Sequence, residues 1–230
     1  NTTPDPLAAP WADAQMRYRA GDLPGAARAC ERVLALDPLH SPARLLASGL
    51  ASAAGRHRLA TEHALAATRR IGRQPLQHVI ALGATLITVG EYEAAATLLR
   101  RIDPVAVPAP GAIAEISQQL SLLEQHDDAL RYLEAALRHG LSGDWASYVH
   151  GNYLRFLGRM EDAAAAYEAS LARNPHYALA QQALATLAPP GDPAPRIARI
   201  RASLARTAVP PRDVAYLEYA KGYYGGGSRS

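Results

Sequence analysis

The sequence predicts an all-α fold built from a repeated pair of helices. Glycine-containing, helix-breaking segments recur about every 34 residues. An alanine follows each segment at one fixed distance, and a small residue precedes it at another. Self-similarity at a single period is typical of arrays in which each repeat packs only on its neighbours. We therefore expect an elongated helical array rather than one compact core.

The turn inside each helix pair is marked by one recurrent position, which we call the turn slot. Its occupants are Gly21, Gly55, Gly90, Glu124 and Gly158. Glycine adopts the left-handed backbone that ends a helix without the penalty of a Cβ atom. Only 17 of the 230 residues are glycine, so four glycines in five slots indicate a genuine repeat.

Two columns of small residues flank the turn slots. The later column is Ala26, Ala60, Ala95, Ala129 and Ala163, and the earlier one is Ala14, Ser48, Gly83, Ser117, Gly151 and Ala185. Small side chains on both members of a helix pair allow the two backbones to approach closely. The first helices are predicted near 8–20, 42–54, 76–89, 111–124, 144–157 and 177–188. Their partners are predicted near 23–36, 57–70, 92–102, 126–138 and 160–173.

Helix-breaking residues separate consecutive pairs. The second helices are predicted to end at Pro38, Gly72, the proline-rich stretch 104–110, Gly140 and Pro175. The proline-rich stretch 189–195 ends the array. Two further helices are expected near 193–206 and 211–224, and Ile197, Ile200 and Leu204 form an apolar stripe that should pack on the last repeat as a cap.

The predicted domain organisation follows from these boundaries. Residues 1–7 are a tail, and 189–224 hold the proline-rich break and the cap. Residues 225–230 have the composition of a linker added in cloning. The array spans 8–188, with repeats near 8–40, 41–74, 75–108, 109–142 and 143–176 and a half-repeat at 177–188.

Three motifs together resemble the tetratricopeptide repeat (TPR). They are a small residue followed by eleven residues and Ala, the pattern Gly-x-(Tyr/Leu/His/Met)-x-x-Ala, and the Asp37-Pro38 or Asn174-Pro175 ending. The match covers roughly 8–188. The resemblance implies a right-handed superhelix, an α-solenoid, of about five repeats plus C-terminal capping helices. It further implies that the first helices line a concave groove, and that the protein is an interaction scaffold holding a peptide or protein segment there.

The repeat register of the resemblance predicts which side chains face the groove. They are Trp11, Gln15, Tyr18 and Arg19 in the first repeat, Leu45, Gly49, Ser52 and Ala53 in the second, Gln77, Ile80, Ala84, Ile87 and Thr88 in the third, Ala114, Gln118, Ser121 and Leu122 in the fourth, and Trp145, Tyr148, Asn152, Arg155 and Phe156 in the fifth. The fifth repeat combines aromatic residues, Asn and Arg, the types enriched where binding energy concentrates. The alternative is that these aromatics pack on the helix at 177–188 or on the cap. Some TPR domains bind the C-terminal tails of chaperones through Lys and Asn side chains. Because the array contains no Lys, we do not expect this type of binding here.

The C-terminal helices carry the main basic cluster. Arg196, Arg199 and Arg206 form an expected anion-binding or domain-docking patch, and a solvated helix face is the alternative. The order of segments here is similar to the junction before the catalytic domain of bacterial tetratricopeptide-containing sulfotransferases. That resemblance implies a non-catalytic domain that positions substrate or docks a catalytic domain absent from this chain, and no catalytic residue can be carried over.

Composition narrows the classes of function. Net charge is +3 and the charges of both signs are interspersed, so we do not expect a nucleic-acid partner. Cys30 is the single cysteine, which suits a reducing, cytoplasmic setting. No apolar stretch is long enough to cross a membrane. Nucleotide loops and His/Cys clusters are absent from the sequence, so we expect no catalytic site, no metal and no cofactor.

Overall fold

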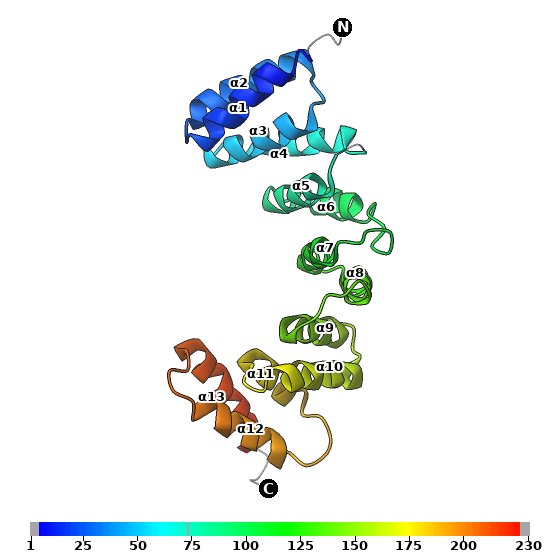
Figure 1. The fold of residues 1–230 in the computed structure, drawn as a ribbon, viewed down its shortest axis with the longest axis vertical. Helices are drawn as coiled ribbons and strands as arrows, with labels where there is room; N and C mark the ends of the chain where they lie inside the picture. The colour runs from blue at the N-terminus through cyan, green and yellow to red at the C-terminus, as the bar shows by residue number, and fades with distance from the viewer. Residues whose placement is uncertain (1–4, 73, 226–230) are drawn as a thin grey trace. The chain divides into compact units, whose positions relative to one another are not determined.

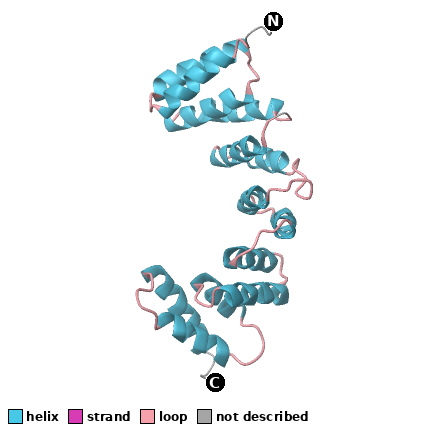
Figure 2. Cartoon of the chain, in the orientation of Figure 1, coloured by secondary structure: helices cyan, strands magenta, loops and turns pink. Residues whose placement is uncertain are grey.

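The computed structural model describes residues 5–72 and 74–225, and every regular element in these ranges is helical (Figure 2). The chain divides into two compact units, unit 1 over residues 1–103 and unit 2 over residues 104–230. The division falls inside the predicted array of 8–188, whose continuity as one array stays a prediction.

Unit 1 consists of three helix hairpins (Figure 1). Its elements are α1 (Ala8–Arg19), α2 (Leu23–Leu36), α3 (Ser41–Ala53), α4 (His57–Ala67), the 3-10 turn η1 (Thr68–Arg70), α5 (Leu76–Thr88) and α6 (Tyr92–Leu99). Within each hairpin the two helices pack on each other, and α2 with α3 and α4 with α5 join one hairpin to the next. The odd-numbered helices α3 and α5 also touch directly.

Unit 2 contains two further hairpins and a three-helix end (Figure 1). Its elements are α7 (Pro110–Leu122), α8 (His126–Arg138), α9 (Asp144–Phe156), α10 (Met160–Arg173), α11 (Ala178–Leu187), α12 (Ala194–Leu204) and α13 (Pro211–Gly225). Most predicted helices are confirmed to within one or two residues. The helix predicted over 92–102 is shorter, because Asp103 precedes Pro104 and is disfavoured from helical backbone.

The turn slots have the backbone that the sequence predicts. All five residues have positive φ, at 77° for Gly21, 72° for Gly55, 84° for Gly90, 59° for Glu124 and 77° for Gly158. Each therefore ends the first helix of its pair in the left-handed region. Glu124 alone does so with a side chain.

The small-residue columns lie where the two helices of a pair touch. Every alanine of the later column is fully buried. The hydroxyl of Ser48 donates to the carbonyl of Ala60 at 2.8 Å, and that of Ser117 to the carbonyl of Ala129 at 2.7 Å, so each joins the two columns. At Gly151 a Cβ atom would lie 2.5 Å from the ring of Tyr167 on the partner helix. These positions are small because the partner helix leaves no room.

The predicted cap is confirmed as a hairpin of α12 and α13 packed on α11. Ile200 is buried with Leu217 and Ala220 against Ala178 and Ala185, and Leu204 packs against this cluster. Helix α11 lacks a second helix of its own repeat, and the cap covers the face that such a helix would cover.

Candidate functional site

A groove of about 810 Å³ lies between the first helices of unit 1, and we call it the unit 1 groove. Its lining comes mainly from α1, α3 and α5, and includes Trp11, Gln15, Tyr18, Arg19, Leu45, Leu46, Gly49, Ala53, His78, Ala81 and Thr85. Seven predicted groove residues are among them, Trp11, Gln15, Tyr18, Arg19, Leu45, Gly49 and Ala53, and Trp11, Gln15 and Tyr18 are those predicted to bind the partner. That these three bind a partner stays a prediction.

The unit 1 groove is lined by large apolar side chains at its sides, and the glycine Gly49 lies at its base. Trp11 and Tyr18 from α1 and Leu45 from α3 supply aromatic and aliphatic surface. The edge of Trp11 meets the ring of His40 at 5.3 Å, which fixes its orientation. Gly49 lies in the middle of α3, is exposed, and has nothing within 4 Å of the place a Cβ would occupy. A smaller hollow of about 440 Å³ shares Gly49, Ala53 and Thr85 with the groove.

Within the described part of the lining, Arg19 is the single arginine, lysine or acidic residue. Among the described residues no carboxylate pairs with it. His78 also faces the groove, and its Nε2 lies 2.8 Å from the Ser41 hydroxyl, which donates to the carbonyl of Ala67. Burial, with a smaller effect of His40, holds the pKa of His78 below its usual range. At neutral pH the groove is therefore an apolar surface with one positive charge at its side.

In unit 2 the predicted residues of α9 form an aromatic and polar cluster. The hydroxyl of Tyr167 donates to Oδ1 of Asn152 at 2.8 Å. Tyr148 lies between the rings of Tyr167 and Tyr177, at centroid distances of 6.0 and 5.3 Å. The guanidinium of Arg155 lies 5.0 Å over the ring of Phe156. Tyr148 therefore packs toward α11, whereas Asn152 and Arg155 stand beside the Tyr167 hydroxyl.

The remaining predicted side chains of unit 2 differ in exposure. Phe156 is 52% exposed and stacks on His126 at 4.6 Å, and Trp145 is 39% exposed. Gln118 is exposed on α7. Ser121 is half-buried beside Tyr153, whose pKa is raised by burial, while hydrogen bonds to Ser117 and Ser121 oppose that rise. Both Trp145 and Phe156 therefore present aromatic surface to solvent.

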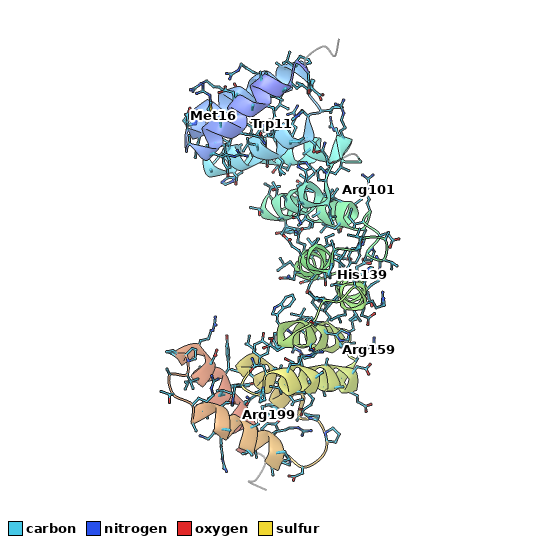
Figure 3. All side chains as sticks on the ribbon, in the orientation of Figure 1. Trp11, Met16, Arg101, His139, Arg159 and Arg199 are labelled. Atoms are coloured by element: carbon cyan, nitrogen blue, oxygen red, sulfur yellow. The ribbon has the colours of Figure 1, made fainter. Side chains whose placement is uncertain are left out.

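The predicted basic patch is partly engaged within the chain. Arg199 lies on α12 (Figure 3). Its guanidinium forms two hydrogen bonds to the carboxylate of Glu168 on α10, at 2.9 and 3.2 Å. Arg196 adds a 3.6 Å contact to the same carboxylate, and Arg206 is exposed. Two of the three arginines thus help to hold the cap on α10, which no sequence pattern indicated.

Comparison with known proteins identifies the architecture. No protein-family model and no curated protein sequence matches the chain. Among solved structures, YrrB, described as a TPR protein with an unusual peptide-binding site, is 19% identical with a TM-score of 0.58 over 74% of this chain and 87% of that one. MamA protein is 18% identical with a TM-score of 0.56 over 73% and 91%. A tetratricopeptide repeat protein from Parabacteroides merdae ATCC 43184 is 14% identical with a TM-score of 0.59 over 94% and 84%.

The chain has the TPR fold. Within that fold the register prediction for the third repeat needs a correction. Ile80 was expected to face the groove, but it is 2% exposed and belongs to the core, whereas His78, Ala81 and Thr85 line the groove. One residue more separates Gly55 from Gly90 than separates Gly21 from Gly55. The extra residue precedes the helix and leaves its register unchanged, because Gly83 is buried and Ala84 exposed, just as Ser48 is buried and Gly49 exposed in the second repeat. Ala114 of the fourth repeat was also expected to face the groove, but it is 4% exposed and belongs to the core.

Three further properties of the described residues concern metal binding, thiol reactivity and membrane insertion. In the ranges 5–72 and 74–225, no group of three or more His, Cys, Asp or Glu side chains could hold a metal ion. Burial raises the pKa of the Cys30 thiol to about 11, so this cysteine is protonated and inert at neutral pH. Across the same ranges, no helix combines the length and apolar character needed to cross a membrane.

Proposed function

We propose that the chain is a protein-interaction scaffold that captures a peptide or protein segment along its first helices, beginning with the unit 1 groove. The observation that carries the proposal is the groove of about 810 Å³ with aromatic walls over the bare position Gly49. Its volume is within the roughly 300–1,000 Å³ of pockets that bury most of a ligand. YrrB, which shares the fold, is described as having a peptide-binding site.

Gly49 supports close approach by a partner's main chain. A glycine in the middle of a helix destabilises that helix by about 0.5–1 kcal/mol relative to alanine. No neighbouring atom of the described chain requires the space, because the Cβ position is open to 4 Å. The open Cβ position therefore leaves room for a partner's main chain to approach α3 closely.

The walls supply the surface that such an occupant would bury. Tyr18 is 52% exposed and Trp11 half-buried, so each already has a fixed apolar base and a free face. Aromatic side chains of this kind commonly dominate binding energy because they bury large areas with little loss of rotamer freedom. Arg19 would favour a segment that carries a carboxylate near its apolar residues.

The test begins by selecting a binder for the intact chain from a displayed library of random twelve-residue peptides. The selected peptide is labelled with fluorescein, and its affinity is measured by anisotropy. Gly49→Leu should place a side chain in the groove, and Tyr18→Ala should remove an aromatic ring from its lining. Each change should lower the affinity for the selected peptide by about tenfold or more. Circular dichroism should show unchanged helicity.

Matched controls exist on α13, far from the groove in sequence. Gly222 is an exposed helical glycine with an open Cβ position, and Tyr219 is 53% exposed. Gly222→Leu and Tyr219→Ala should leave the affinity unchanged. Full affinity in both groove variants, or failure of the library to yield any peptide, would contradict the proposal.

A second candidate function is the non-catalytic domain of a bacterial sulfotransferase, with a catalytic domain docked on the cap. The observation in its favour is a pair of exposed aromatic side chains one helical turn apart on α13, Tyr219 and Tyr223, at 53% and 44% exposure. The discriminating observation is the source gene after residue 224. A sulfate-donor loop encoded there would support this candidate, and an unrelated sequence would remove it.

A further inference from the structure

Arg155 on α9 is an arginine without an anion. Its side chain is half-buried, and its Nε atom is fully buried with no hydrogen-bond partner. No carboxylate pairs with it among the described residues of unit 2. Several other arginines of unit 2 pair with carboxylates: Arg131 with Asp128, Arg159 with Asp162, and Arg196 and Arg199 with Glu168.

The surroundings hold the Arg155 guanidinium in place from several directions. The Phe156 ring lies beneath it at 5.0 Å and is itself stacked on His126. Arg155 also interacts with the Tyr167 hydroxyl: burial raises the pKa of Tyr167, and both the charge of Arg155 and a hydrogen bond from its side chain oppose that rise. The guanidinium is therefore pre-positioned, and ordering it costs a ligand little side-chain entropy.

Asn152 adds a second donor one helical turn away. Its Oδ1 accepts the Tyr167 hydroxyl at 2.8 Å, which fixes the amide so that Nδ2 is left to donate. Guanidinium and amide groups on one helix face offer only hydrogen-bond donors, and donors converging beside an uncompensated positive charge select an anion. Buried polar atoms almost always have partners in folded proteins, so the orphaned Nε calls for one.

We propose that Arg155 and Asn152 form a carboxylate-binding site in unit 2, whose ligand is an Asp or Glu side chain of a partner peptide. One unpaired guanidinium matches the single charge of a carboxylate. Phe156, exposed at 52% beside the charge, gives the same peptide an apolar surface for a neighbouring residue. The carboxylate site lies outside the unit 1 groove and shares no residue with it. The two proposals can therefore be tested independently.

The test observes the Arg155 Nε–H group directly by NMR in the ¹⁵N-labelled intact chain. Its signal is assigned by its loss in Arg155→Met, and burial should keep it visible by slowing exchange. The probes are the capped dipeptides acetyl-Phe-Glu-amide and acetyl-Phe-Gln-amide, which differ only in charge. We expect a saturable shift with the Glu probe and none with the Gln probe.

Variants separate recognition from a structural role. Arg155→Met should weaken binding of the Glu probe by about tenfold or more, whereas Arg159→Met, at an arginine already paired with Asp162, should leave it unchanged. The melting temperature of Arg155→Met should be equal to or above that of the parent, because the change removes an unpaired, partly buried charge. A clearly lower melting temperature would assign Arg155 to structure and overturn the proposal.

Two other outcomes would also overturn it. Equal shifts from the Glu and Gln probes would show that charge is not recognised. Inorganic phosphate shifting the Nε–H signal at lower concentration than the Glu probe would make this a phosphate site instead. If the carboxylate site fails while the groove variants still lose their selected peptide, the proposed scaffold function is unaffected.

Discussion

The residues at the five turn slots share a positive backbone angle φ. Four of the five are glycines with φ between 72° and 84°, and Glu124 is held at 59° by the same local hydrogen bonds. The Gln125 amide donates to the carbonyl of Leu120, as Asp22 donates to that of Arg17 in the first hairpin. A residue with a Cβ atom in this region costs about 1 kcal/mol that glycine avoids. The turn geometry is thus imposed by the hairpin, and Glu124 is strained to fit it.

Replacing this residue should therefore stabilise the protein. Glu124→Gly relieves the left-handed strain, although greater freedom of the unfolded chain offsets part of the gain, so we expect an increase of about 0.5–1 kcal/mol in the free energy of unfolding. The matched control is Glu115→Gly, at an exposed position inside α7, which should lose about 1 kcal/mol. Urea denaturation of both variants measures the difference. A less stable Glu124→Gly protein would show that its side chain contributes more than the strain costs.

At the scale of elements, each first helix needs an apolar surface to cover it. In the five earlier hairpins, whose small-residue columns match, the second helix provides that cover. Helix α11 is covered instead by α13 and α12, through Leu217 and Ile200. Glu168 reaches across from α10 to Arg199, so the cap is fixed by burial and by one charged contact. The cap closes the apolar face that would otherwise be open to solvent.

The cap is thus expected to depend on Ile200, which is 1% exposed. Ile200→Ala should lower the free energy of unfolding by about 2–4 kcal/mol, because it removes buried methyl groups and leaves a cavity. Ile197→Ala, at a half-buried position one turn earlier on the same helix, should cost less. Thermal unfolding followed by circular dichroism gives both values. Equal losses would show that Ile200 is no more important than its neighbour for seating the cap.

The helices were predictable because their ends carry local signals. Glycine turn slots and helix-ending prolines act within a few residues, so the sequence alone places most boundaries. The side of α5 that faces the groove could not be predicted in the same way. Its residues 79–82 are Val, Ile, Ala and Leu, and such an apolar run does not indicate which side of the helix is buried. The Arg199–Glu168 contact spans 31 residues and has no local signature. Which apolar side is buried, and which charges pair, depend on packing between helices.

At the scale of the whole chain, the histidines with clearly lowered pKa values lie in unit 1. Burial is the first cause at His40, His63 and His78 alike. The charge of Arg44 lowers the pKa of His63 further, and its Nη1 lies 2.9 Å from Nδ1 of that ring. His40 also caps α3 by accepting from the amide of Ala43. Protonation would remove the acceptor nitrogens that His40 offers to Ala43 and that His63 offers to Arg44, both contacts of the α3–α4 hairpin.

Unit 1 should consequently lose stability on acidification. Above the unfolded-state pKa of about 6.5 the rings are neutral in both states, and pH has no effect through them. Below it the unfolded chain binds protons before the folded chain does, so stability falls until the pH passes the lowered folded values. Hydrogen exchange read by mass spectrometry at pH 7.5 and 5.5, corrected for intrinsic rates, should show lost protection in peptides from residues 5–72. His78→Gln, which keeps a hydrogen-bonding group near Ser41, should reduce the loss. Greater protection of these peptides at pH 5.5 would mean that the charged rings gain partners in the folded state, contrary to the burial that lowers their pKa values.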